Sequence, residues 1–419
     1  MDKLVIEGGR ELNGTIRISG AKNAALPILS AVILAEGEYN ISEAPELVDI
    51  STMLKLLKEF GISSERTGKS VKINTVFEPE AFTAPYELVK TMRASVLTLG
   101  PLLARKGKAR VSLPGGCAIG ERPVDLHLKA LEAMGATITV EHGYIDAECP
   151  KLKGAIINFD IVTVTGTENI MMAACLAEGE TVLRNAAQEP EVVDLAHFLK
   201  KMGARITGEG TSEITIIGVE KLHSADYSIM PDRIEAGTFI CCVAAAGGSV
   251  EITNVPVDVM RTTLDKIAET GLKIERVNST TIRVTKDKPL VSTDVSTAPY
   301  PGFPTDMQAQ FMSLMTVANG FSVVTENIFE NRFMHVAELK RMGADIKLKD
   351  KSAMIRGVKS LMGAPVMASD LRASASLVIA GLMAEGKTEV SRLYHLDRGY
   401  EDFVEKLSGV GANLSRVKE

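Results

Sequence analysis

Residues 134–140 of this chain read Met-Gly-Ala-Thr-Ile-Thr-Val. The glycine follows an amphipathic stretch and precedes a stretch in which apolar and polar residues alternate. A glycine directly beyond an amphipathic helix takes the left-handed conformation that ends the helix, and the alternation after it predicts a β-strand. The pattern occurs six times, and its glycines are 74, 68, 68, 72 and 68 residues apart. They are Gly61, Gly135, Gly203, Gly271, Gly343 and Gly411. This period indicates six repeats of about 70 residues, which account for all 419 residues.

Each repeat also contains a second helix that is apolar on nearly every side. Residues 24–35, 170–176, 239–246 and 374–384 are examples. A helix without a polar face is buried all round, so we expect strands to enclose it. We expect each of these helices to end at a glycine, and the six glycines are Gly37, Gly107, Gly179, Gly247, Gly320 and Gly386. The repeats therefore predict an α/β protein of two domains with three repeats each, and we place the chain crossings near Gly20 and Met230.

Composition and charge exclude several classes of protein. Apolar residues make up 45% and charged residues 24% of the chain, as in ordinary globular proteins. The net charge of −6 argues against a general nucleic-acid binder, and every apolar run is shorter than the ~20 residues of a membrane helix. The N-terminus is unlike a signal peptide, and five cysteines without a C-x-x-C pair suit a reducing compartment. We expect a cytoplasmic protein that binds neither nucleic acid nor membrane.

Polar residues begin the buried helices, at repeat-equivalent positions fourteen residues before the second series of glycines. They are Asn23, Arg93, Thr165, Arg233, Asp306 and Arg372. Helix N-termini favour anions, so arginines at three of these positions indicate an anion site. The alternative is that Asn, Thr and Asp at these positions only cap their helices, as they commonly do. Arginine is not a capping residue and needs a bound anion or an acidic partner there.

Residues 113–125, Leu-Pro-Gly-Gly-Cys-Ala-Ile-Gly-Glu-Arg-Pro-Val-Asp, place Cys117 in a glycine-rich loop. The neighbouring Arg122 favours the thiolate by lowering the pKa of a thiol. Cys117 is therefore either a reactive thiol or, as single cysteines more often are, a small buried residue. We interpret the other cysteines as buried: Cys149, Cys175, Cys241 and Cys242.

Lys22 and Asp306 each stand at the entrance to an apolar helix. A lysine at the start of a buried helix costs free energy of folding unless its charge is paired with an anion. A carboxylate among arginines can accept a proton from a substrate hydroxyl, so Asp306 is a candidate base, with a salt-bridging cap as the alternative. The six histidines show no metal-ligand spacing, and we interpret them as structural.

Four motifs point to one family. They are residues 20–27 (Gly-Ala-Lys-Asn-Ala-Ala-Leu-Pro), the Cys117 stretch through residue 126, residues 303–310 (Phe-Pro-Thr-Asp-Met-Gln-Ala-Gln) and residues 370–376 (Asp-Leu-Arg-Ala-Ser-Ala-Ser). From Leu4 to about Ala412 the chain closely resembles the UDP-N-acetylglucosamine 1-carboxyvinyltransferases, enolpyruvyl transferases that open peptidoglycan synthesis. The resemblance implies a two-domain inside-out α/β barrel of six βαβαββ repeats. It implies a first domain of residues 22–230 and a discontinuous second domain of residues 1–21 and 231–419.

The resemblance also implies the reaction and its residues. The enolpyruvyl group of phosphoenolpyruvate would pass to the 3-hydroxyl of UDP-N-acetylglucosamine by addition and elimination, with release of phosphate. Phosphoenolpyruvate would be held by Lys22, Asn23, Arg122, Arg372 and Arg398. The UDP-sugar would be held by Arg93, Arg122, Pro123, Val124, Asp125, Leu126, Thr163, Val164, Thr165, Asp306 and Ile328. The catalytic residues would be Cys117 as the acid, Asp306 as the base, and Lys22. The family needs no metal or organic cofactor, and fosfomycin alkylates the thiol that matches Cys117.

Two other interpretations remain. 5-Enolpyruvylshikimate-3-phosphate synthase shares the fold and the donor, but it has Gly-Ser-Lys-Ser where residues 20–23 read Gly-Ala-Lys-Asn, and it lacks the Cys117 loop. A non-catalytic repeat scaffold would gain nothing from buried arginines at repeat-equivalent positions.

Overall fold

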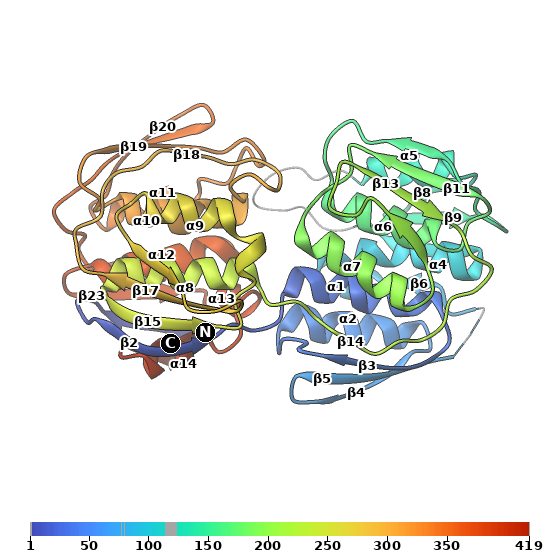
Figure 1. Ribbon diagram of the computed structural model, residues 1–419, viewed down its shortest axis with the longest axis horizontal. Coiled ribbons are helices and arrows are strands. Elements are labelled where there is room, and N and C mark those ends of the chain that lie inside the picture. Colours follow the sequence, from blue (N-terminus) through green and yellow to red (C-terminus); the bar gives the residue numbers. More distant parts are fainter. Residues whose placement is uncertain (1, 77, 79, 114–123, 419) are drawn as a thin grey trace. The chain divides into compact units, whose positions relative to one another are not determined.

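The computed structural model describes residues 2–76, 78, 80–113 and 124–418. These residues form two compact units, which Figure 1 shows as ribbons. Unit 1 contains residues 2–19 and 231–418, and unit 2 contains residues 20–113 and 124–230. Each unit has one hydrophobic core, built from its own residues.

Unit 2 contains three four-stranded sheets and the helices that they enclose. The sheets are β14-β3-β5-β4, β6-β7-β9-β8 and β10-β11-β13-β12. The strands are β3 (Gly37–Ser42), β4 (Ser63–Thr67), β5 (Ser70–Thr75), β6 (Thr83–Ala84), β7 (Lys108–Ser112), β8 (Thr137–Glu141), β9 (Tyr144–Glu148), β10 (Ile156–Asn158), β11 (Glu180–Arg184), β12 (Arg205–Thr207), β13 (Glu213–Ile217) and β14 (Tyr227–Ser228). The helices are α1 (Lys22–Ala31), η1 (Val32–Leu34), α2 (Val48–Glu59), α3 (Tyr86–Val89), η2 (Arg93–Thr98), α4 (Leu99–Lys106), α5 (Asp125–Ala133), α6 (Val164–Ala174) and α7 (Pro190–Lys201).

Unit 1 repeats this design with the sheets β16-β17-β15-β2, β18-β19-β21-β20 and β22-β23-β1-β24. Its strands are β1 (Asp2–Glu7), β2 (Leu12–Arg17), β15 (Gly248–Thr253), β16 (Lys273–Arg276), β17 (Thr281–Lys286), β18 (Val295–Ser296), β19 (Phe321–Thr325), β20 (Asp345–Lys349), β21 (Ser352–Arg356), β22 (Pro365–Met367), β23 (Lys387–Ser391) and β24 (Asn413–Lys418). Its helices are α8 (Arg233–Ala246), η3 (Val257–Val259), α9 (Arg261–Ala268), η4 (Thr305–Met307), α10 (Gln308–Met315), α11 (His335–Arg341), α12 (Leu371–Met383), α13 (Tyr394–Asp397) and α14 (Phe403–Gly409).

All six sheets have the same strand pairing. In the sheet of β6, β7, β8 and β9, β6 pairs with β7 in parallel, and the other two pairs are antiparallel. The connection from β6 to β7 carries the buried helix α4, and the connection from β7 to β8 carries the amphipathic helix α5. This order is βαβαββ, and the other five sheets have the same one parallel and two antiparallel pairs. The predicted sixfold α/β repeat is confirmed.

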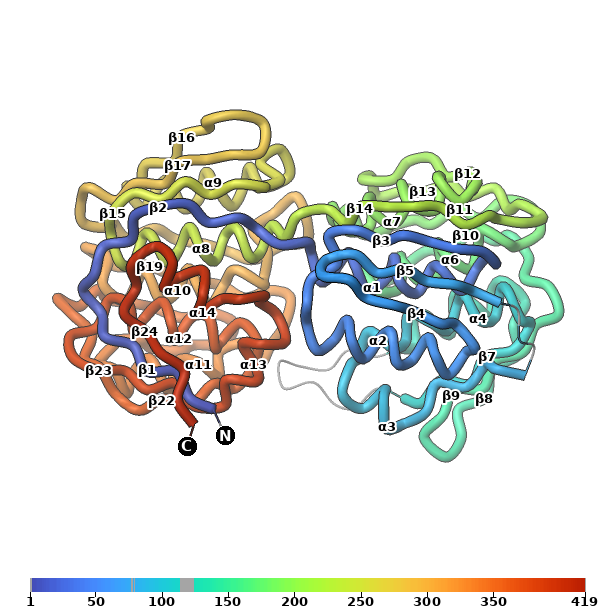
Figure 2. Tube along the Cα trace, turned by 90° about the horizontal axis from the view of Figure 1, so that it is seen from below, coloured from blue at the N-terminus to red at the C-terminus, as the bar shows by residue number. Residues whose placement is uncertain are grey.

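Three of the strands reach their sheet from a distant part of the chain. Strand β14 pairs with β3, so residues 227–228 complete the sheet that begins at residue 37. In unit 1, β2 pairs with β15, and β1 lies between β23 and β24. Figure 2 shows β1 beside β24, with both ends of the chain close together. The first segment of the chain therefore contributes to two sheets of unit 1.

The glycine signature of the sequence is a helix C-terminal motif. After α2, Gly61 N donates to Lys58 O (3.0 Å) and Ile62 N donates to Leu57 O (3.1 Å). These two bonds form the Schellman motif, which needs a left-handed residue at the glycine, and Gly61 has a φ of +82°. The same pair of bonds closes α5, α7, α11 and α14. The repeated glycines are therefore set by backbone geometry rather than by chemistry.

The apolar helices are buried, as their sequences predict. In α8 every residue from Ile234 to Ala245 is buried, and in α12 every residue from Arg372 to Leu382 is buried. Gly107 and Gly247 are the C-cap residues of α4 and α8. In the other four repeats the glycine lies further on, where the next strand begins.

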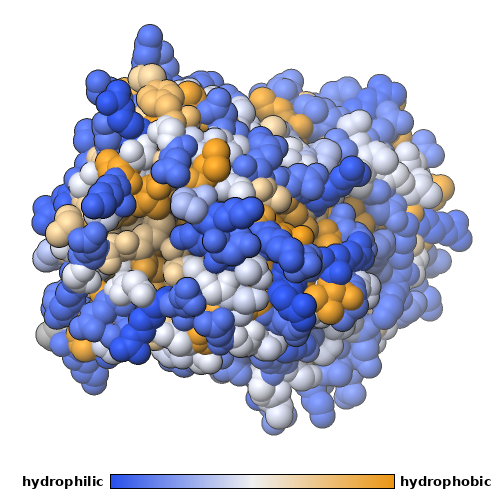
Figure 3. Space-filling model, turned by 60° about the vertical axis from the view of Figure 1, so that its left-hand side comes forward, coloured by the Kyte–Doolittle hydropathy of each residue, from blue (hydrophilic) through white to orange (hydrophobic). Residues whose placement is uncertain are grey.

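The outer surface carries mainly polar side chains with apolar ones among them. Figure 3 shows this mixture over one face of the molecule. Large apolar side chains are exposed on strands, for example Phe321 on β19 and Ile217 on β13. Within the described ranges, no helix combines the length and the apolarity that crossing a membrane requires.

Candidate active site

The six repeat-equivalent residues all lie at or next to the start of a buried helix. Asn23, Thr165 and Arg372 are the second residues of α1, α6 and α12. Arg93 and Arg233 are the first residues of η2 and α8, and Asp306 is in η4, just before α10. The side-chain caps of α6, α8 and α12 are other residues, Thr163, Asp232 and Asp370. The repeat-equivalent residues are thus placed at or next to helix N-termini, and in α6, α8 and α12 a neighbouring residue forms the side-chain cap.

In unit 1, Asp306 is held between two buried arginines. Its Oδ2 accepts from Arg372 Nε (3.2 Å) and Nη2 (2.8 Å), and its Oδ1 lies 2.8 Å from Arg332 Nη2. Arg372 is 2% exposed and Arg332 is 6% exposed. Burial alone would raise the pKa of Asp306, but Arg372 and Arg332 outweigh it and hold this pKa well below its usual range. The carboxylate is therefore ionised, and in this state it is a weak base.

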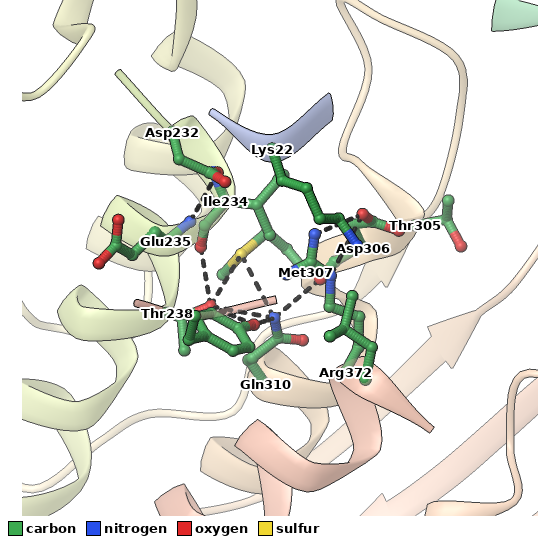
Figure 4. A network of polar contacts seen from close by, with 12 residues as sticks. Lys22, Asp232, Ile234, Glu235, Thr238, Thr305, Asp306, Met307, Gln310 and Arg372 are labelled. Carbon is green, nitrogen blue, oxygen red and sulfur yellow. Dashed lines mark hydrogen bonds and ion pairs between the residues drawn. The ribbon is translucent and has the colours of Figure 1, made fainter. Parts of the chain in front are cut away.

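A network of buried polar side chains holds the main chain of Asp306 in place (Figure 4). Gln310 Nε2 donates to the main-chain oxygen of Asp306 (2.8 Å) and to Thr238 Oγ1 (3.1 Å). Thr238 in turn donates to Ile234 O in the first turn of α8, at 2.7 Å. Gln310 and Thr238 together therefore connect η4 to α8. The hydroxyl of Tyr400 lies 3.1 Å from Thr238 Oγ1. The main chain of the candidate base is thus fixed to the start of a second buried helix.

Arg372 retains capacity to bind an anion. Its Nε and Nη2 are used by Asp306, and its guanidinium lies 5.3 Å from the ring centroid of Tyr400. The buried Nη1 has no hydrogen-bond partner among the residues that the structure describes. A buried guanidinium nitrogen without a partner is costly, so a ligand oxygen is the expected partner. Arg398 follows α13, which packs against α12, and it is half-buried.

In unit 2, three of the predicted UDP-sugar segments meet around His127. Its Nε2 lies 3.4 Å from Thr165 Oγ1, and its Nδ1 lies 2.9 Å from Asn169 Nδ2. Main-chain groups of η2 and α4 orient the Asn169 amide, so its nitrogen donates to Nδ1 and the imidazole proton stays on Nε2. Burial, assisted by Arg93, lowers the pKa of His127 to about 4 despite the opposing effect of Asp125. A neutral histidine therefore joins the 124–126 segment to the 163–165 segment, and Asn169 links it to η2, which begins at Arg93.

Lys22 is buried at the start of α1 and meets an acidic partner. Its Nζ lies 3.2 Å from Asp49 Oδ2, and the two residues are 8% and 5% exposed. The next residue, Asn23, is exposed. Asp49, a residue of unit 2, is therefore an anionic partner of the kind that we expected for Lys22.

The remaining predicted residues are distributed as follows. Val124 is the N-cap of α5, Asp125 is exposed in its first turn, and Leu126 is half-buried. Thr163 accepts a hydrogen bond from Gly166 N at 3.2 Å, and Val164 begins α6. Ile328 is half-buried in the loop after β19. Cys117, Arg122 and Pro123 lie outside the described residues. The other four cysteines are free and buried, as predicted.

Several residues of these clusters were missed from the sequence, among them Arg332, Asp49 and His127. Arg332 lies between β19 and α11, away from any repeat-equivalent position, so the periodicity could not reveal it. Asp49 stands in the first turn of α2, where an acidic residue is ordinary. His127 had a usable signal, because it directly follows the motif at residues 122–126.

The comparisons with known proteins agree on the class. Residues 6–407 match the family described as EPSP synthase (3-phosphoshikimate 1-carboxyvinyltransferase). The solved enolpyruvyl transferase NikO from Streptomyces tendae superposes with a TM-score of 0.90 at 24% identity, covering 100% of this chain and 99% of that one. EPSP synthase from Acinetobacter baumannii superposes with a TM-score of 0.78 at 21% identity over the full length of both chains. The fold is that of the enolpyruvyl transferases, as predicted.

Sequence relatives define the family more closely. The UDP-N-acetylglucosamine 1-carboxyvinyltransferase of Nitratidesulfovibrio vulgaris (strain Miyazaki F) is 59% identical over 100% of both chains. The protein of the same name from Geobacter metallireducens is 56% identical over 100% of both chains. This chain belongs to the UDP-N-acetylglucosamine 1-carboxyvinyltransferase family of enolpyruvyl transferases.

Proposed function

We propose that this chain transfers the enolpyruvyl group of phosphoenolpyruvate to the 3-hydroxyl of UDP-N-acetylglucosamine and releases phosphate. The full-length identity to enzymes of that name supports the reaction. The structural observation that carries the proposal is Asp306 between Arg372 and Arg332, because it joins a candidate base to buried cations. A scaffold would have no use for this desolvated cluster. The reaction is the first committed step of peptidoglycan synthesis.

The donor is a small molecule with a carboxylate and a phosphate, which guanidinium groups bind well. We assign its binding to Lys22, Asn23, Arg122, Arg372 and Arg398. The unpartnered Nη1 of Arg372 supports this assignment. When Arg372 binds the donor, it no longer neutralises Asp306 fully, and the pKa of Asp306 rises toward its usual range. The base would thus become effective only when the donor is bound.

We assign the acceptor to the cluster around His127, together with Asp306 and Ile328. These residues are Arg93, Arg122, Pro123, Val124, Asp125, Leu126, Thr163, Val164, Thr165, Asp306 and Ile328. The free N–H groups of the first turn of α6 favour an anionic group such as a diphosphate. His127 is uncharged near neutral pH and donates from Nε2, so Thr165 can give its own hydroxyl proton to an acceptor atom of the ligand.

The addition step needs two proton transfers. Asp306 accepts the proton of the 3-hydroxyl, the sugar oxygen attacks C2 of phosphoenolpyruvate, and C3 receives a proton from Cys117. The product of this addition is a tetrahedral phosphate ketal. In the elimination the thiolate of Cys117 takes back a C3 proton and phosphate leaves with the proton held by Asp306, which gives the enolpyruvyl ether and restores both groups. Arginines placed against the donor stabilise its developing charge, an effect worth about 3 kcal/mol for one well-placed donor group. We also propose that fosfomycin alkylates Cys117.

Phosphate release with two alternative acceptors tests the proposal. Phosphoenolpyruvate is supplied together with UDP-N-acetylglucosamine or with shikimate-3-phosphate, and phosphate is measured over time. We expect turnover with the nucleotide sugar only. Turnover with shikimate-3-phosphate would make the chain an EPSP synthase, and turnover with neither acceptor would refute transferase activity. Thermal shifts with each acceptor alone provide a binding readout that is independent of turnover.

A further inference from the structure

Glu326 is a buried carboxylate that the proposed mechanism does not use. It directly follows β19 and is 1% exposed. Its Oε1 accepts from Thr297 Oγ1 (2.9 Å), Ile328 N (2.8 Å) and Phe329 N (3.1 Å). Its Oε2 accepts from Thr305 Oγ1 at 2.8 Å. One side chain therefore joins three segments: the end of β18, the loop after β19, and η4.

These contacts continue from Glu326 to Asp306 in a fixed direction. Because the hydroxyl proton of Thr305 goes to Glu326, the Thr305 oxygen accepts from Arg332 Nη1, at 2.9 Å. Arg332 Nη2 then holds Asp306 Oδ1 at 2.8 Å. A carboxylate, a hydroxyl and a guanidinium thus form one chain of hydrogen bonds that ends on the candidate base.

The position requires a carboxylate rather than an amide. Two carboxylate oxygens offer about four acceptor sites, and four donors occupy them here. A glutamine at residue 326 would have one acceptor oxygen and would turn its amide nitrogen toward a partner. If that nitrogen faced Thr305, the threonine oxygen would meet donors from both sides, and Arg332 would lose its anchor.

We propose that Glu326 is a positioning residue that couples the loop at Ile328 to the Arg332–Asp306 ion pair. Through this coupling the base and the main chain beside the acceptor keep a fixed relative position. The inference rests on the proposed function, because it takes Ile328 as an acceptor contact and Asp306 as the base. Glu326 itself would touch neither substrate.

Three variants separate the two branches of this network. Glu326→Gln perturbs both branches, and Thr305→Val removes only the link to Arg332. Asn327→Ala is the matched control, because the Asn327 amide binds Ser296 and Thr297 in the same loop without reaching Arg332. For each variant, kcat and both KM values are measured by phosphate release across a range of pH, together with the melting temperature.

We expect Glu326→Gln to raise the KM for UDP-N-acetylglucosamine about tenfold, the effect of losing hydrogen bonds to a charged group. The KM for phosphoenolpyruvate should stay within about twofold, since the network contains no group that we assign to donor binding alone. Both Glu326→Gln and Thr305→Val should move the acid limb of kcat to higher pH by about one unit, because Arg332 would neutralise Asp306 less well. Asn327→Ala should change neither quantity.

An unchanged acceptor KM and acid limb in Glu326→Gln would overturn the inference, and so would equal losses in Asn327→Ala. If Glu326→Gln fails to fold, Thr305→Val against Thr305→Ser decides: the valine must move the acid limb and the serine must leave it in place. A wild-type protein that fails to turn over UDP-N-acetylglucosamine would overturn the proposed function, and the coupling with it. A failure confined to the variants would overturn the coupling alone.

Discussion

Arg372 holds Asp306 by placing two of its nitrogens, Nε at 3.2 Å and Nη2 at 2.8 Å, on the same carboxylate oxygen. The other oxygen is left to Arg332. Both interactions form within unit 1, between the starts of two buried helices and the loop after β19. A strong ion pair of this kind keeps the carboxylate ionised and unreactive until another anion competes for the guanidinium.

Replacing Asp306 should abolish turnover without shifting its pH optimum. Asp306→Asn keeps the shape of the side chain but cannot take up the acceptor proton, so kcat should fall by about 100- to 10,000-fold at every pH. Phosphate release between pH 5 and 9 checks this prediction. Asp345→Asn, on an exposed strand residue of the same unit, is the control and should be fully active. A variant of Asp306 with normal kcat at a displaced pH optimum would contradict its role as the base.

Fosfomycin should modify one thiol in the native protein. Cys149 is 5% exposed, and Cys175, Cys241 and Cys242 are fully buried. Burial raises the pKa of Cys175 to about 12, which suppresses its thiolate. Intact-mass measurement should therefore show a single adduct, and none in Cys117→Ser.

Cys117→Ser should also lose phosphate release while UDP-N-acetylglucosamine still raises its melting temperature. Near-normal phosphate release by this variant would show that Cys117 is not the acid. A second fosfomycin adduct would show that one of the buried thiols is accessible.

Removing one partner of the buried Lys22–Asp49 pair should be costly. Asp49→Asn leaves the lysine charge poorly compensated, and we expect a loss of about 3 kcal/mol in the free energy of unfolding. Urea denaturation measures the loss. The exposed pair of Lys273 and Glu275 is the control, since Glu275→Gln should cost less than about 1 kcal/mol.

A double variant separates the stability of this pair from its catalytic role. Lys22→Met combined with Asp49→Leu should recover most of the stability, because an apolar pair can replace a buried ion pair. It should still release no phosphate, since the cation that we assign to donor binding is gone. Recovered turnover in the double variant would remove Lys22 from the mechanism.

Glu235 should make unit 1 less stable as the pH rises toward neutrality. Burial raises the pKa of Glu235 from 4.5 to about 7, against the opposing effect of Lys406. Between pH 4.5 and about 7 the folded protein therefore keeps a proton that the unfolded chain has released. This difference in proton binding stabilises the folded state fully below pH 4.5, and the stabilisation is lost as the pH rises through 7. Glu235→Gln does not titrate, so its melting temperature should fall less than that of the wild type between pH 4.5 and 8. Parallel melting curves for the two proteins would contradict this assignment.

The sequence predicted those features that repeat. Gly61 and its five equivalents were recognisable because the chain takes a left-handed conformation at the same place in every repeat, and in five repeats this residue belongs to a Schellman motif. Asp306 and Arg372 were found in the same way, as polar residues at the start of apolar helices. An ion pair was among the alternatives for each residue, but their pairing with each other was not predictable, because it depends on how α10 and α12 pack side by side. Arg332 and Glu326 were missed because they lie in a connection whose length and sequence differ from repeat to repeat.

The pairing of β1 with β23 and β24 has a consequence for the order of events on the ribosome. Strand β1 is synthesised before the other strands of unit 1, yet both of its neighbours, β23 and β24, are synthesised after all of them. All strands of unit 2 have been made by residue 228, so that unit can reach its native state while translation continues. Strand β1 must meanwhile remain unpaired, and unit 1 can complete the sheet that contains it only after residues 387–418 have been synthesised.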